Sequence, residues 1–117
     1  MARILIMDDD ASVRTALKNL LQQEGHEITE APNVLEGAKI YSTSAPDLII
    51  TDLLMPERDG VEALLELRSQ YPTIKTIVIS GDAPEFLPIV EDLGANRTLS
   101  KPFKNQDVLA AVQELLA

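Results

Sequence analysis

The chain has 117 residues, the usual size of one domain, and 45 % of them are hydrophobic, enough for one core over residues 1–117. The absence of cysteine excludes disulfides and thiolate metal sites and agrees with a cytoplasmic location. The formal net charge of -9 argues against direct binding to nucleic acid or anionic lipid, and the apolar run before Asp8 is too short for a signal peptide or membrane span.

The first part of the chain reads as two strands, each followed by a helix. The run Ile4–Met7 predicts a strand covered on both faces, whereas Glu27–Ala31 is weaker and is typical of an edge strand. Asn33 and Glu36 form a capping-box pattern that opens the second helix. The first helix carries a stripe with helical spacing that stops before Gly25, namely Val13, Ala16, Leu17, Leu20 and Leu21, and the apolar residues of the second are Val34, Leu35, Ala38 and Tyr41.

The rest of the chain continues the alternation of strands and helices. Leu48–Thr51 and Thr76–Ile79 predict two more buried strands, and Thr98–Ser100 predicts a second edge strand. Between Pro84 and Leu93 we expect a short, distorted or late-starting helix, because Pro88 would remove a hydrogen bond. The two other helices are marked by Val61, Leu64 and Leu65, and by Val108, Leu109, Val112, Leu115 and Leu116 after an opening at Asn105 and Asp107.

Five such strand and helix pairs predict an α/β fold in which a parallel sheet carries helices on both faces, a three-layer sandwich. In sheets of this kind the ligand crevice lies beyond the carboxyl ends of the strands. Polar residues that directly follow the predicted strands are therefore the candidates for a functional site.

Polar side chains follow four of the five predicted strands. Asp8 and Asp9 follow the first, Asp52 ends the third, Ser80 ends the fourth and Lys101 follows the fifth. Taken singly, each has a plain structural interpretation as a helix cap, a turn residue, a loop hydroxyl or a solvated cation. Because helix caps and turns need no such coincidence at one end of a sheet, we favour a functional site.

The residue types at this end of the sheet indicate a metal and a phosphoryl group. Carboxylates about 4 Å apart repel by roughly 4 kcal/mol at an effective dielectric near 20, so the acids need a cation. Oxygen ligands without cysteine or a nearby histidine favour Mg2+ over zinc or copper. Beside such an ion Asp52 can attack phosphorus to give an aspartyl phosphate, while Lys101 pairs with a phosphoryl oxygen and Ser80 donates a hydrogen bond.

The sequence resembles the response-regulator receiver family of two-component signalling along almost its whole length. The resemblance rests on Asp8-Asp9-Asp10 after Ile-Leu-Ile-Met, on D-x-x-M-P-x-x-D-G from Asp52 to Gly60, on Ser80-Gly81 after Ile-Val-Ile, and on Lys101-Pro102-Phe103. It implies a flavodoxin-like (βα)5 fold with strand order 2-1-3-4-5 and a cis bond between Lys101 and Pro102.

The resemblance also implies a ligand set for Mg2+ and a route for the signal. Asp9 and Asp52 would ligate the ion directly, Asp8 through water, and Leu54 through its backbone carbonyl. The phosphoryl group would come from a histidine kinase or phosphotransfer protein, and the output would be altered binding to a downstream protein, with a phosphorylation-dependent homodimer as a family habit. Ser80 would shift toward the phosphoryl group, but Thr98 stands where the family usually has an aromatic switch residue.

Two other functions remain open from the sequence. One is a receiver-like scaffold that works without phosphorylation. The other is an aspartyl-phosphate hydrolase, which Leu54 disfavours because such enzymes usually carry a second acid two residues after the nucleophile. His26, the single histidine, follows the helix stop at Gly25 and is expected to be a solvated turn residue rather than a catalytic base.

Overall fold

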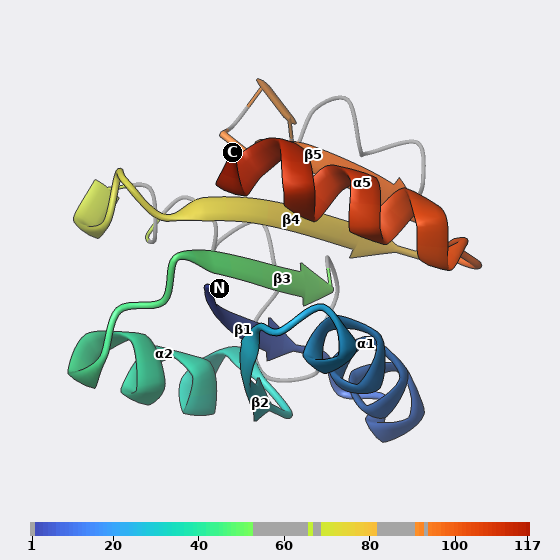
Figure 1. The fold of residues 1–117 in the computed structure, drawn as a ribbon. Helices are drawn as coiled ribbons and strands as arrows, with labels where there is room; N and C mark the ends of the chain where they lie inside the picture. Colours follow the sequence, from blue (N-terminus) through green and yellow to red (C-terminus); the bar gives the residue numbers. More distant parts are fainter. Residues whose placement is uncertain (1, 53–65, 67–68, 82–90, 93) are drawn as a thin grey trace.

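The computed structural model describes residues 2–52, 66, 69–81, 91–92 and 94–117. Five parallel strands form one sheet in the order β2-β1-β3-β4-β5, which confirms the predicted fold and places the two weak runs at the edges (Figure 1). The strands are β1 (Arg3–Met7), β2 (Glu27–Ala31), β3 (Leu48–Asp52), β4 (Lys75–Ser80) and β5 (Arg97–Ser100), and the helices are α1 (Ala11–Gln23), α2 (Val34–Thr43) and α5 (Asn105–Leu116). The helices predicted between β3 and β4 and between β4 and β5 lie outside the described residues.

Alternation along the three central strands builds a hydrophobic core on each face of the sheet. Ile4 and Ile6 of β1 face α1 and α5, whereas Leu5 and Met7 face α2. Ile50 of β3 joins the first of these cores, with the buried residues of α1 and α5. Figure 1 shows α5, in red, lying along β4 and β5. Because both faces of β1, β3 and β4 are covered, these strands read as continuous apolar runs in the sequence.

The first helix ends before Gly25 and the second opens at Asn33, as the sequence indicates. The Asp10 side chain caps α1 by accepting a hydrogen bond from the Ser12 amide, and the chain leaves this helix through Gly25, whose φ of 90° suits glycine. Asn33 caps α2 by accepting a hydrogen bond from the Glu36 amide at 2.8 Å. Asp10 is therefore the N-cap of α1.

Two details of the helix predictions need correction. Leu35 does not belong to the buried face of α2, because the residue is 56 % exposed and the buried residues of the helix are Val34, Gly37 and Tyr41. The helix α5 begins at Asn105 as predicted, but Lys104 occupies the N-cap position and no side chain caps the helix there. Asp107 still lies in the first turn of α5, where a carboxylate interacts favourably with the helix dipole.

The cap of α2 gives a stability prediction that is remote from the acidic residues. Replacing Asn33 with alanine should lower the free energy of unfolding by about 1 kcal/mol, because the Glu36 amide loses its acceptor. Urea unfolding followed by circular dichroism measures the change. The Asn33→Ser variant keeps a capping oxygen and should stay within about 0.5 kcal/mol of the wild type. Equal losses in both variants would contradict a capping role.

Candidate functional site

The register of the sheet brings the four strand ends to one edge. Met7 pairs with Thr51, Asp52 pairs with Ile79, and Ser80 pairs with Ser100. The residues that follow β1 and β5 therefore emerge beside the last residues of β3 and β4. This is the carboxyl edge, where doubly wound sheets hold their ligands.

Three carboxylates meet at this edge. Asp8, Asp9 and Asp52 each offer one oxygen, and these oxygens all lie within 4.8 Å of one another. Asp8 is buried, Asp52 is mostly buried and Asp9 is exposed. A cluster of oxygen donors with one side open to solvent suits a hard divalent cation that keeps part of its water shell. The residues present therefore fit Mg2+.

Lys101 lies between two of these acids. Its Nζ is 3.1 Å from Oδ2 of Asp8 and 2.9 Å from Oδ2 of Asp52. Partial burial lowers the pKa of Lys101, but the hydrogen bonds to Asp52 and Asp8 outweigh burial, and the net pKa lies above the ordinary value. The lysine is therefore a charged partner for both acids at neutral pH.

The backbone around Lys101 holds its side chain over the acids. The Lys101 amide donates to the Ser80 carbonyl at 2.8 Å, and the Lys101–Pro102 peptide bond is cis, as the family resemblance led us to expect. Gly81 leaves room for the lysine, because a Cβ at that position would lie 3.1 Å from the lysine Cβ. Ser80 is buried at the end of β4 and directly precedes Gly81 in the chain.

Asp8 is fixed by several hydrogen bonds. Its amide donates to the Ala31 carbonyl at 3.2 Å, and its Oδ1 accepts from the Asp10 amide at 2.9 Å while Oδ2 faces Lys101. Burial raises the pKa of the Asp8 carboxyl, although the bonds from Asp10 and Lys101 act in the opposite direction. The arrangement orients one acid of the cluster firmly.

The remaining sequence candidates lie apart from the acids or outside the described residues. Leu54 is not among the described residues. Thr98 is half-buried in β5, where it pairs with Val78, and its switch role stays a prediction. His26 is not simply a solvated turn residue, because it is partly buried and its Nδ1 accepts from the Ala2 amide at 3.2 Å. It precedes β2, at the opposite edge of the sheet from the acids.

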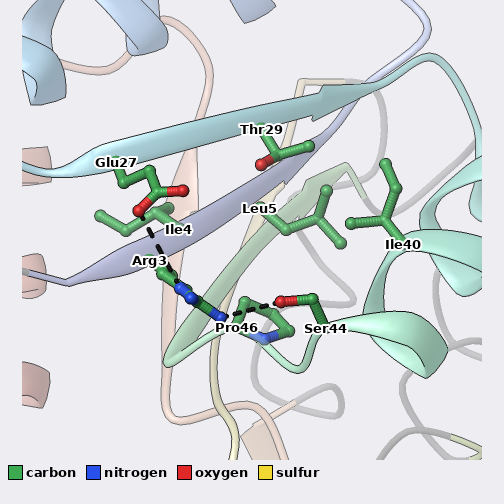
Figure 2. Close-up of a pocket in the computed structure, with 8 residues that line it drawn as sticks. All are labelled: Arg3, Ile4, Leu5, Glu27, Thr29, Ile40, Ser44 and Pro46. Carbon is green, nitrogen blue, oxygen red and sulfur yellow. Dashed lines mark hydrogen bonds and ion pairs between the residues drawn. The ribbon is translucent and has the colours of Figure 1, made fainter.

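A cavity of about 110 Å3 also lies away from the acids (Figure 2). Its lining includes Arg3 and Glu27, the first residues of β1 and β2, and Ser44 after α2. Arg3 bonds to Ser44 Oγ at 2.8 Å and lies 3.9 Å from Glu27. This is the amino edge of the strands, so the acidic cluster and not this cavity is the candidate site.

A doubly wound parallel sheet that carries a lysine and an acidic cluster able to hold a divalent cation at its carboxyl edge is typical of α/β proteins that bind phosphorylated ligands there. The family model of the response regulator receiver domain matches residues 4–113. The chain belongs to this family. Receiver domains act as signalling switches of two-component systems rather than as conventional enzymes, and phosphorylation and an acidic Mg2+ site are standard for them.

Individual relatives agree with the family. The chemotaxis protein CheY of Listeria monocytogenes is 35 % identical, over 97 % of this chain and 98 % of that protein. The alkaline phosphatase synthesis transcriptional regulatory protein PhoP of Bacillus subtilis is 32 % identical over 97 % of this chain but only 48 % of its own length. The chain therefore resembles both a protein of its own length and about half of a longer regulator.

Solved structures of receiver domains are also similar to this chain. A response regulator receiver domain protein from Clostridium thermocellum superposes with a TM-score of 0.92 at 28 % identity, covering 99 % of this chain and 94 % of that one. A CheY-like receiver domain protein from Methanospirillum hungatei gives 0.93 at 30 % identity, with the same coverage. Among the described residues of our chain, no helix has the length and apolar character that crossing a membrane requires.

Proposed function

We propose that the chain is a phosphoacceptor switch, a single receiver domain over residues 1–117 that acts in the cytoplasm and takes a phosphoryl group onto Asp52. The observation that carries the proposal is the meeting of Asp52 with two other carboxylates and the Lys101 ammonium at the carboxyl edge of the sheet. The donor would be a phosphohistidine on a histidine kinase or phosphotransfer protein. The output would be altered binding to a downstream protein, with homodimerisation on phosphorylation as an expectation from the family.

Asp52 is the proposed nucleophile. A carboxylate oxygen of Asp52 forms a bond to phosphorus while the bond from phosphorus to the donor imidazole nitrogen breaks, and the imidazole leaves with its electron pair. Asp9, Asp52 and the Leu54 backbone carbonyl would hold Mg2+, with Asp8 acting through water. When bound, the ion neutralises charge on the phosphoryl oxygens.

Lys101 and Ser80 are proposed to receive the phosphoryl group. The Lys101 ammonium now divides its hydrogen bonds between Asp8 and Asp52, and it can transfer one of them to a phosphoryl oxygen without leaving the cluster. Ser80 ends the strand beside Asp52, where its hydroxyl can donate to another oxygen after a small shift. Thr98 is the proposed site at which the usual aromatic response is altered.

Intact-protein mass spectrometry with acetyl phosphate and MgCl2 tests the acceptor chemistry. The wild type should gain about 80 Da, the mass of one phosphoryl group, and the Asp52→Asn variant should gain nothing because its amide is not nucleophilic. An unmodified wild type would favour the scaffold function. Sustained release of inorganic phosphate far beyond one equivalent per chain would favour the hydrolase.

A further inference from the structure

We propose that Arg14 is a positioning residue for the metal centre, holding the peptide between Asp8 and Asp9 with a guanidinium that Glu30 fixes from the other side. The inference rests on the proposed function, because it concerns Mg2+ at the acidic cluster. Neither Arg14 nor Glu30 belongs to the residues that mark the family or follow a predicted strand.

The contacts of Arg14 run from the first helix to the acidic turn and the edge strand. Its Nη1 donates to the backbone carbonyl of Asp8, and its Nε lies 3.6 Å from Oε1 of Glu30. The arginine side chain as a whole is only 17 % exposed, so these two partners hold a side chain that is packed against the protein along most of its length. Arg14 thus connects α1, β2 and the turn that leaves β1.

The Asp8 carbonyl is an effective place to hold this turn. It belongs to the planar peptide unit that joins Asp8 to Asp9, so fixing its oxygen fixes the direction in which the chain enters Asp9. On the preceding side, the Asp8 amide is held by the Ala31 carbonyl at 3.2 Å. The two contacts together orient the backbone from which both carboxylates project.

The charge of Arg14 acts against this positional effect. A cation near the acidic cluster repels Mg2+, so its removal should strengthen metal binding if charge alone mattered. Glu30 offsets the charge, because its two oxygens lie against Arg14 and, at 3.5 Å, against Lys18. Lys18 shares this carboxylate partner, and no contact joins Lys18 to Asp8 among the described residues. Lys18 is therefore a matched control.

Calorimetric titration of Mg2+ into the metal-free protein separates the two effects. Arg14→Met should bind Mg2+ about tenfold more weakly than the wild type, as is usual when a residue supporting a metal ligand is lost. Lys18→Met should stay within about twofold of the wild type, because it leaves the Asp8 carbonyl held. An Arg14→Met affinity equal to or tighter than that of the wild type overturns the proposal, and so does equal weakening in both variants.

Arg14→Lys keeps the experiment decisive if Arg14→Met does not fold. Lysine retains the charge but has a single ammonium in place of the planar fork, so it cannot hold Asp8 and Glu30 in the same geometry. We expect this variant to bind Mg2+ more weakly than the wild type. A wild-type affinity would show that the planar guanidinium of Arg14 is not required. If the wild type itself binds no Mg2+, the proposed function fails rather than the role of Arg14 within it.

Discussion

Replacing Lys101 with methionine should lower the free energy of unfolding by about 3 kcal/mol at pH 7 in the absence of divalent cations. In the wild type the ammonium lies 3.1 Å from Asp8 and 2.9 Å from Asp52, and both acids are largely buried. Removing one partner of a buried ion pair leaves an uncompensated charge, which costs about 3–5 kcal/mol, and two carboxylates would face each other here. Urea unfolding in a chelating buffer measures the loss.

The penalty for losing Lys101 should depend on pH through Asp8. Burial already raises the pKa of Asp8 above 3.8, and loss of the lysine removes an interaction that lowers it. An acid whose folded pKa exceeds its unfolded pKa takes up protons on folding, so native stability rises as the pH falls through the folded value. The difference between wild type and variant should therefore be largest near neutral pH and should shrink toward pH 4.

A lysine three residues further along provides the control. Lys104 is exposed, so Lys104→Met should change the free energy of unfolding by less than about 0.5 kcal/mol. Adding MgCl2 should recover part of the loss in Lys101→Met and stabilise this variant more than the wild type, because the cation replaces the missing ammonium. Equal unfolding curves for the two methionine variants would show that Lys101 does not stabilise the acids.

The buried strands could be predicted closely because each faces a core on both sides. Apolar runs such as Ile4–Met7 could therefore be recognised as strands without knowing which elements cover them. The observed strands extend these runs by at most one residue at either end. The meeting of Asp8, Asp9, Asp52 and Lys101 was also predictable, since parallel strands bring their carboxyl ends to one edge. The strand order itself came from the family resemblance rather than from the apolar pattern.

Features that depend on spatial partners could not be predicted from the sequence. The Asn96 side chain accepts from the Thr76 amide at 2.9 Å and so extends the pairing of β4 with β5, yet nothing in its sequence surroundings marks it. Arg14 reads as an ordinary polar position on the exposed side of an amphipathic helix, because its partners belong to another strand and another turn. Leu35 misled the prediction because helical spacing does not reveal how far a helix is turned toward its sheet.

Replacing Ile50 with alanine should lower the free energy of unfolding by about 3 kcal/mol, the usual cost of emptying a core position. Ile50 is 1 % exposed in the central strand β3, within the core that α1 and α5 cover. Because the side chains on that face are densely packed, they have little freedom to move into the cavity that the alanine leaves.

The exposed Leu35 gives the matched control for Ile50, because its change to alanine removes the same number of carbon atoms. With Leu35 56 % exposed, the Leu35→Ala variant should unfold within about 0.5 kcal/mol of the wild type. Urea midpoints at constant slope measure both changes, since an unaltered slope shows that the same surface is exposed on unfolding. Similar losses in the two variants would contradict the assignment of Ile50 to the core that supports the Asp52 strand.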